Sequence, residues 1–456
     1  MTQTLPTAAL AGNRAEHLAE VLTALYPPPC RISYDDDRPV DGEELLAEYR
    51  IVPSLRRPRL LVPSCRRLAA AGLRSAGRRN SRGGRLAVAL GAVGLTVPGA
   101  ADLLLRDVIR VHGPPGADCF GRYAEHALGD RARNLVIHIG GAARANRKPV
   151  AALLDRAGHP TSYAKLGVGE LSRVLVINER VALGALAGAG LRHTVVPDVV
   201  HAGGWRGQEV LVQSALPVHQ PPGAGSDAPV LALAMAEVAQ SQGGSRGRLA
   251  ESAYWSGLRV RIAAAADPGP LAHAAESLLR IAGEVPLSYG AWHGDWTPWN
   301  CCRVGQRMLV WDWERHAAGA PLGFDALHYR LAARLAGSRR SRGRVEPGRL
   351  LHEELLDAPE SLAPFGVSAR EARVTTALYV VEIAARYLSD GQHNPAAVAV
   401  TQHLLPRVAR ELLAALTREL LPALRTHLLA RLSPTSARPE TPASAPAPAA
   451  DGEESR

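Results

Sequence analysis

Cysteine is scarce in this chain: five occur among 456 residues, and none stand in a C-x-x-C spacing. This usage predicts neither a structural zinc site nor a disulfide framework, and it fits thiols that are kept reduced. The N-terminus shows no charged segment followed by an apolar core, so no signal peptide is expected. These absences together favour a cytoplasmic protein.

Long apolar runs are also scarce. Residues 86–101 form a largely apolar segment, but glycine and proline interrupt it at Gly91, Gly94, Pro98 and Gly99. A segment of this length and composition is short and poorly helical for a membrane span. We therefore expect it to pack inside the protein.

Acidic residues are absent between residues 56 and 85, where ten arginines occur. The formal net charge of the chain is +10, so this block accounts for the whole basic excess. The block is either arginine on solvated helix faces, which we favour, or a contact with nucleic acid or an anionic membrane surface. No aromatic side chains lie among these arginines, which argues against a platform for stacking single-stranded nucleic acid.

Lysine is almost absent, because only Lys148 and Lys165 occur beside 51 arginines. Where arginine supplies nearly all other cations, a retained lysine is a candidate for a role that needs a compact ammonium group. Lys165 follows a strand-like segment at residues 150–154 and a turn at Gly158, so it lies on the next expected strand. The alternative is an ordinary exposed lysine on that strand.

The densest chemical signal lies at residues 293–300, which read H-G-D-x-x-x-x-N. Asp295 and Asn300 are five residues apart, so one loop can turn both side chains toward one small volume. An Asp there can orient a substrate hydroxyl and accept its proton, while an Asn oxygen can bind a metal ion. Asp312 follows an expected β-hairpin over residues 301–311 and supplies a second oxygen ligand of the kind that Mg²⁺ requires.

These residues resemble the motif of the aminoglycoside phosphotransferase and choline kinase group, small-molecule kinases with a protein-kinase-like fold. The resemblance implies that Asp295 is the catalytic base, that Asn300 and Asp312 bind the metal, and that the cofactors are ATP and Mg²⁺. His293 is expected to brace the loop. Protein kinases carry H-R-D and D-F-G, whereas this chain has Gly294 and a D-W-E segment. A small-molecule hydroxyl acceptor is therefore favoured over a protein.

The resemblance also implies an ATP-binding part upstream. Lys165 is expected to contact the phosphates, and Glu179, on a predicted helix, is expected to hold Lys165 in an ion pair. The alternative for Glu179 is a solvent-facing side chain. A loop between two expected strands is a candidate for covering the phosphates, although it lacks G-x-G-x-x-G and fits an ordinary basic hairpin nearly as well. Its basic residues are Arg144, Arg147 and Lys148.

The implied fold is α+β and bilobal, like a protein kinase, with a small β-rich N-terminal lobe, a mostly helical C-terminal lobe and an extra N-terminal region. Asp325, in a P-L-G-F-D segment typical of the same group, is expected to cap a helix and to support the site structurally. The expected units are residues 1–110, the N-terminal region with the Arg-rich block; residues 111–216, the ATP-binding lobe; residues 217–432, the helical lobe with the catalytic loop; and residues 433–456, a disordered Pro/Ala-rich tail.

We therefore expect an ATP- and Mg²⁺-dependent phosphotransferase that transfers the γ-phosphate to a hydroxyl group of a small molecule. A sugar, an amino alcohol or an aminoglycoside-like compound would each suit this chemistry. The helical part shows no obvious acidic cluster of the kind that a polycationic aminoglycoside needs. The alternative is a nucleotide-binding regulatory or scaffold protein that keeps a kinase-like fold with little catalysis.

Overall fold

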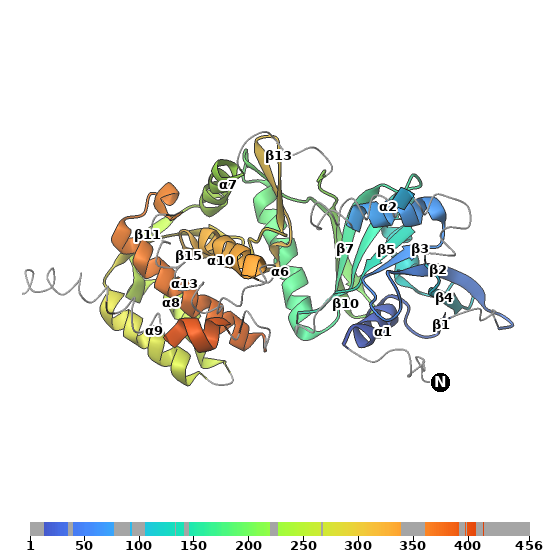
Figure 1. Ribbon diagram of the computed structural model, residues 1–456, viewed down its shortest axis with the longest axis horizontal. Helices are drawn as coiled ribbons and strands as arrows, with labels where there is room; N and C mark the ends of the chain where they lie inside the picture. The colour runs from blue at the N-terminus through green and yellow to red at the C-terminus, as the bar shows by residue number, and fades with distance from the viewer. Residues whose placement is uncertain are drawn as a thin grey trace, which may run out of the picture.

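The computed structural model describes residues 13–34, 40–76, 92–93, 105–132, 134–140, 146–218, 227–265, 268–338, 361–391, 397, 399–406 and 414. Arg144, the expected tail at residues 433–456 and nearly all of residues 86–101 lie outside this set. Helices and antiparallel sheets occur together in the described chain, which makes the fold α+β as predicted. Figure 1 shows the large sheet on one side, a helical part on the other, and α6 (Glu170–Ala187) between them.

A nine-stranded sheet organises the first half of the described chain. Neighbouring strands are antiparallel, in the order β1-β4-β2-β3-β5-β6-β7-β10-β9. The strands are β1 (Arg31–Tyr34), β2 (Glu44–Val52), β3 (Leu60–Pro63), β4 (Val108–Gly113), β5 (Asn134–His138), β6 (Val150–Leu154), β7 (Pro160–Gly167), β9 (Val199–Trp205) and β10 (Gln208–Ser214). The N-terminal strands β1 to β4 thus extend the sheet that carries Lys165, and the boundary expected at residue 110 falls inside β4.

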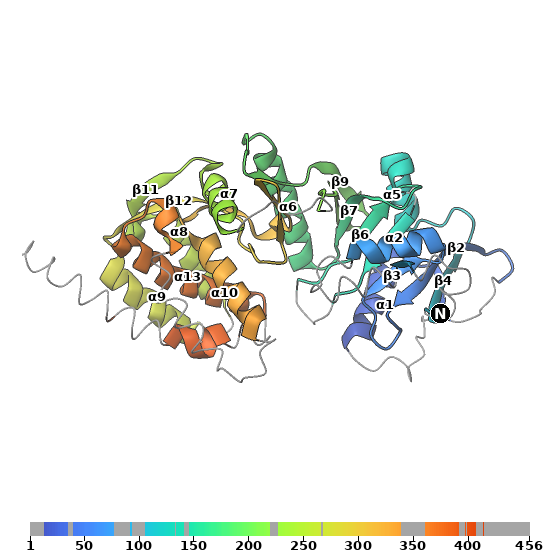
Figure 2. The same ribbon diagram turned by 45° about the horizontal axis from the view of Figure 1, so that its top comes forward.

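Helices cover both faces of this sheet. α1 (Asn13–Leu25) and α5 (Phe120–Leu128) pack on one face. α2 (Arg66–Ala76) packs on the other face, where Figure 2 shows it against β3. Because successive side chains of a strand point to opposite faces, Ala152 and Leu153 of β6 belong to different hydrophobic clusters, one on each face.

The second half of the described chain is mostly helical. Its helices are α7 (Ala228–Gln240), α8 (Ala253–Ala263), α9 (Gly269–Ala282), α10 (Phe324–Ser338) and α13 (Ala369–Ser389). α13 is buried on nearly all sides between Glu371 and Ala385, as expected for a helix inside a core. No helix in this described set is long and apolar enough to cross a membrane.

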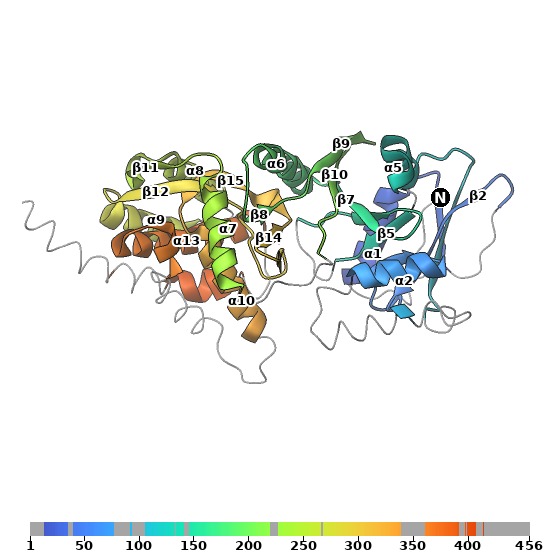
Figure 3. The same ribbon diagram turned by 90° about the horizontal axis from the view of Figure 1, so that it is seen from above.

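Two small sheets accompany these helices. One consists of β11 (Ser245–Arg248), β12 (Pro286–Trp292) and β15 (Ala317–Pro321). The other consists of β13 (Cys301–Val304), β14 (Arg307–Val310) and β8 (Thr194–Val195). Figure 3 shows α7 beside β8 and β14. The hairpin of β13 and β14 is the one predicted directly after the H-G-D-x-x-x-x-N motif.

α6 joins the two halves of the described chain. It corresponds to the helix that the sequence predicts over residues 171–186. Its residues Val176 and Leu183 share a hydrophobic cluster with Leu211 of β10 and with Trp313 of the D-W-E segment. A side chain on the inner face of α6, such as Glu179, is therefore held between the large sheet and the D-W-E segment.

Candidate active site

Buried hydrogen bonds fix the first residues of the loop at residues 293–300, between β12 and β13. His293 is fully buried, and its Nδ1 accepts a hydrogen bond from the backbone N–H of Asp295 at 3.1 Å. The ring proton is therefore on Nε2, which donates to the carbonyl oxygen of Trp311 at 3.1 Å. Burial lowers the pKa of His293 to about 4, so the ring stays neutral at physiological pH. The imidazole thus links the loop to the strand that leads to Asp312.

Asp325, in the first turn of α10, holds the same loop from another side. Its Oδ2 accepts the backbone N–H of His293 at 2.7 Å, and its Oδ1 accepts that of Gly294 at 3.1 Å. Burial raises the pKa of Asp325 to about 7, although both N–H donors act in the opposite direction. Asp325 thus bridges from α10 to the loop at residues 293–300, whereas the sequence predicts a helix cap at this position.

Gly294 is required by the backbone for two reasons. Its φ is +83°, in the left-handed region that side chains rarely adopt. A Cβ atom would lie 2.2 Å from the carbonyl oxygen of Arg315 and 2.8 Å from the Arg315 Cβ. An arginine at this position, as in the H-R-D motif, would displace the segment that carries Arg315.

Asp295 presents a partly exposed carboxylate, with 34% of the side chain accessible. Asn300 Nδ2 donates to Asp295 Oδ2 at 2.9 Å and to the Asp295 carbonyl oxygen at 3.0 Å, which leaves Asn300 Oδ1 outside both bonds. His328 Nε2 lies 3.1 Å from Asp295 Oδ1. Burial raises the pKa of Asp295, but the hydrogen bond from His328 and the charge of Arg386 outweigh it. The pKa is therefore lower than usual, and the group is a carboxylate at neutral pH.

Lys165 on β7 meets two acids from distant parts of the chain. Its Nζ lies 2.5 and 2.7 Å from the two carboxylate oxygens of Glu179, and 2.7 Å from Asp312 Oδ1. Lys165 is 5% exposed and Glu179 is 0% exposed. Burial lowers the pKa of Lys165, but the charges of Asp312 and Glu179 outweigh it, so the pKa is raised and the ammonium is retained.

Asp312 has a left-handed backbone, with φ 74° and ψ 53°, which non-glycine residues rarely adopt. Such a conformation persists only where surrounding contacts fix it. Lys165 binds the side chain, and Glu179 Oε1 accepts the backbone N–H of Trp313 at 3.2 Å. Burial raises the pKa of Asp312, yet the charges of Lys165 and Lys148 hold it well below its usual range.

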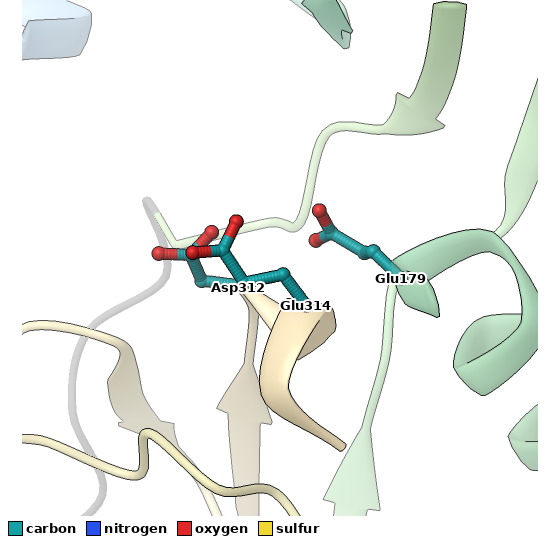
Figure 4. A group of neighbouring side chains, drawn as sticks. All are labelled: Glu179, Asp312 and Glu314. Carbon is teal, nitrogen blue, oxygen red and sulfur yellow. The ribbon is translucent and has the colours of Figure 1, made fainter. Parts of the chain in front are cut away.

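A third carboxylate completes this cluster. Figure 4 shows the carboxylate of Glu179 directed toward those of Asp312 and Glu314, which lie side by side, and one oxygen of each of the three residues lies within 4.8 Å of the others. Glu314 is 5% exposed and forms an ion pair with Lys148 Nζ. Asn178 Nδ2 donates to the Glu314 carbonyl oxygen at 2.7 Å. Both lysines of the chain therefore bind carboxylates of the same cluster.

The oxygen donors of this cluster suit a hard divalent cation. Glu179, Asp312 and Glu314 each offer a carboxylate oxygen. The amide Oδ1 of Asn300 stays outside the hydrogen bonds to Asp295. The Asn300 carbonyl oxygen accepts the N–H of Trp311 at 3.0 Å, which keeps Asn300 beside the strand end that carries Asp312. Mg²⁺ binds such oxygens together with phosphates and water. The residues present therefore fit the predicted Mg²⁺ ion.

The loop before β6 borders the N-terminal helix. Burial lowers the pKa of His17 on α1, and the charge of Arg147 acts in the same direction. A Cβ atom added to Gly140 would lie 3.5 Å from His17 Nε2. α1 therefore lies beside Gly140, at the start of the segment that is a candidate for covering the phosphates. Arg144, within that segment, lies outside the described residues.

Three residues beside Asp295 are not anticipated by the sequence motif: His328, Tyr379 and Arg386. His328 follows Asp325 by three positions, so both face one side of α10, and this spacing is the sequence signal that points to His328. The Arg386 side chain donates from Nη1 to the carbonyl oxygen of Gly294. No sequence signal points to Arg386 or Tyr379, because α13 meets the loop only through tertiary packing.

No family model matches the sequence, and no curated protein matches it. Several solved structures are similar at low sequence identity. An amicoumacin kinase in complex with AMP-PNP and Ca²⁺ is 12% identical, with a TM-score of 0.37, over 61% of this chain and 88% of that chain. A choline/ethanolamine kinase family protein from Mesorhizobium loti is 17% identical, with a TM-score of 0.37, over 61% of this chain and 92% of that chain.

A glucosamine kinase is 17% identical, with a TM-score of 0.31, over 92% of this chain and 100% of that chain. These neighbours are small-molecule kinases, the group that the motif at residues 293–300 resembles. Since each of these TM-scores is below 0.5, a functional conclusion for this chain depends on the side chains of the site itself.

Proposed function

We propose that this protein is an ATP- and Mg²⁺-dependent phosphotransferase that transfers the γ-phosphate of ATP to a hydroxyl group of a small molecule. The observation that carries the proposal is the joint geometry of two groups of residues. Lys165 bridges Glu179 and Asp312. Asp295 and Asn300 share a hydrogen bond on the adjoining loop. Phosphoryl transfer of the kinase type needs such a lysine, such oxygen ligands and such an aspartate around one volume.

The phosphate side of the site follows from charge. Lys165 would bind phosphate oxygens, and Glu179 holds its ammonium at the required place. Asp312 and Asn300 would hold the Mg²⁺ ion, which neutralises charge on the phosphates when it is bound. Lys148 and Arg147, together with Arg144 on the same loop, would add positive charge over the phosphates.

The acceptor side of the site follows from Asp295. Its carboxylate is ionised and partly exposed, so it can accept a hydrogen bond from an acceptor hydroxyl and align the oxygen for in-line attack on the γ-phosphorus. The hydroxyl proton passes to Asp295 as the new O–P bond forms and the bond to ADP breaks. Because its pKa is low, Asp295 contributes more by orientation than by basicity before the reaction begins.

The proposed arrangement of the chain is bilobal. The large sheet with Lys165 would form the ATP-binding lobe, extended by strands of the N-terminal region. The helical part after residue 217 would form the lobe that carries the catalytic loop. Use of ATP fits a cytoplasmic location, and the acceptor would be a sugar, an amino alcohol or an aminoglycoside-like compound.

The test is ATP consumption with Mg²⁺ across a panel of sugars, amino alcohols and aminoglycosides, with Asp295→Asn as the matched control. We expect turnover that depends on one acceptor class and is lost in Asp295→Asn, while ATP binding by calorimetry is kept in both proteins. ATP binding with no acceptor-dependent turnover across the panel would favour the alternative, a nucleotide-binding regulatory or scaffold protein. Absence of ATP binding would reject both.

A further inference from the structure

A second buried chain of hydrogen bonds leads away from Asp295, on the side opposite Asn300. His328 of α10 is 4% exposed, and its Nε2 lies 3.1 Å from Asp295 Oδ1. Its Nδ1 lies 2.9 Å from the hydroxyl oxygen of Tyr379 on α13, a residue that is 0% exposed. Three consecutive side chains from three elements are therefore linked behind the exposed face of the Asp295 carboxylate.

The direction of each hydrogen bond in this chain follows from the donor capacity of its members. Asp295 is a carboxylate and can only accept, so His328 donates from Nε2–H. A neutral imidazole carries one proton, so Nδ1 is then an acceptor and the Tyr379 hydroxyl is its donor. Burial raises the pKa of Tyr379, which keeps the hydroxyl protonated, and burial lowers that of His328, which keeps the ring neutral.

The Tyr379 ring is itself held in place by packing. Phe324 contacts it edge to face, with ring centroids 5.7 Å apart, and the His328 ring lies 6.1 Å away at a steep angle. Among the described residues, the Tyr379 hydroxyl forms a hydrogen bond with Nδ1 alone, so a rigid tyrosine holds the imidazole ring at that atom. The Asp295 carboxylate, which can only accept, keeps the ring proton on Nε2, and the held ring keeps Nε2–H directed toward Asp295.

The two oxygens of Asp295 therefore have separate donors. Asn300 Nδ2 holds Oδ2 at 2.9 Å, and His328 holds Oδ1 at 3.1 Å. A carboxylate held at both oxygens cannot rotate about its last side-chain bond without losing a hydrogen bond. Its exposed lone pairs then keep one direction, which is what alignment of an acceptor hydroxyl requires.

We propose that His328 and Tyr379 are positioning residues for phosphoryl transfer: His328 orients the Asp295 carboxylate through its Nε2–H group, and Tyr379 holds the imidazole ring through Nδ1. The inference rests on the proposed function. The acceptor proton goes to Asp295 and does not go on to His328, since Nε2 already bears a proton and Nδ1 faces Tyr379. His328 therefore touches neither substrate nor nucleotide, and its effect is on kcat rather than on binding.

Kinetics of three variants separate positioning from a merely structural role. His328→Leu removes the donor, and we expect kcat to fall on the order of 100-fold with KM for ATP and for the acceptor nearly unchanged. His328→Gln keeps a side-chain N–H, and we expect its kcat to be about tenfold higher than that of His328→Leu. Tyr379→Phe removes the hydrogen bond that holds the imidazole ring at Nδ1, and we expect kcat to fall about tenfold. His273→Gln, at an exposed position on α9, is the matched control and should match the wild type.

A second readout does not need turnover. Imidazole ¹⁵N NMR of the free wild-type protein, with His328→Gln used to assign the signal, should show the proton on Nε2. In Tyr379→Phe we expect the proton to stay on Nε2, with the Nδ1 resonance shifted by the loss of its hydrogen-bond donor. A proton on Nδ1 in the wild type, or a His328→Leu enzyme with wild-type kcat, would overturn the inference. If the wild type transfers no phosphate to any acceptor, the proposed function fails. The tautomer seen by ¹⁵N NMR then still tests whether the hydrogen-bond chain from Asp295 to Tyr379 exists.

Discussion

Replacement of Lys165 by methionine should destabilise the protein strongly, because it removes the ammonium group that bridges two carboxylates. Methionine keeps most of the apolar stem of lysine and removes only the ammonium group. Glu179 is then fully buried and unpaired, and Asp312, at 32% exposure of its side chain, loses its nearest positive partner. Removal of one partner from a buried ion pair costs about 3 to 5 kcal/mol. Since domains are stable by only about 5 to 15 kcal/mol, this is a large share of the total.

The assay is urea unfolding followed by tryptophan fluorescence in the absence of nucleotide. Lys165→Met should unfold at a clearly lower urea concentration than the wild type. A double variant, Lys165→Met with Glu179→Gln, should recover part of the loss, because a buried amide needs no cation, with a coupling energy of about 1 to 3 kcal/mol. Arg180→Met, at an exposed position on the same helix, is the matched control and should change the free energy of unfolding by no more than about 0.5 kcal/mol.

Two results would refute this reasoning. If Lys165→Met and Arg180→Met unfold at the same urea concentration, Lys165 does not neutralise buried charge. If Glu179→Gln adds to the loss in the Lys165→Met background rather than relieving it, Glu179 is stabilised by other groups than the ammonium.

Three further predictions concern the residues around the loop. Gly294→Ala should lower the urea midpoint and the turnover together. A left-handed non-glycine residue costs about 1 to 2 kcal/mol, and its Cβ would lie 2.2 Å from the Arg315 carbonyl oxygen. An unchanged midpoint would contradict the loop geometry. The pKa of Asp325 is about 7 in the folded protein, against an ordinary value of 3.8. Between these pH values the folded state binds more protons than the unfolded state. The free energy of unfolding should therefore fall as pH rises from about 4 to 7, by at most about 1.4 kcal/mol per pH unit. Asp325→Asn should lose that slope in urea midpoints measured from pH 5 to 8, and a slope equal to that of the wild type would contradict the titration. Lys148→Met should lower the free energy of unfolding by about 3 kcal/mol, and the addition of Glu314→Gln should restore part of this loss. A double variant that is no more stable than Lys148→Met would show that the two side chains are not a pair.

The grouping of side chains on the loop at residues 293–300 could be predicted from the sequence because it is local. Asp295 and Asn300 lie on one loop, and Asp312 follows a short hairpin, so their spacing alone limits how far apart they can lie. Lys165 was identifiable for another reason, the near absence of lysine elsewhere. The structure brings its ammonium within 2.7 Å of Asp312, a residue 147 positions away in the chain.

Other features depend on tertiary contacts that no local pattern encodes. Strands β1 to β4 join the large sheet through the pairing of β3 with β5, and both are short strands with ordinary apolar patterns. The ion pair of Lys148 with Glu314 forms between a loop and the D-W-E segment, so it exists only once the sheet and the hairpin have packed around α6. Arg386 reaches Gly294 from a helix that begins 75 residues further along the chain.

The most direct test of the central claim is ³¹P NMR of the wild-type protein with ATP, Mg²⁺ and the pooled acceptor panel. We predict a new phosphomonoester resonance that grows together with ADP and that is absent when Asp295→Asn replaces the wild type. ADP formed together with inorganic phosphate alone would mean that water is the acceptor. That result would contradict a phosphotransferase that acts on the hydroxyl group of a small molecule.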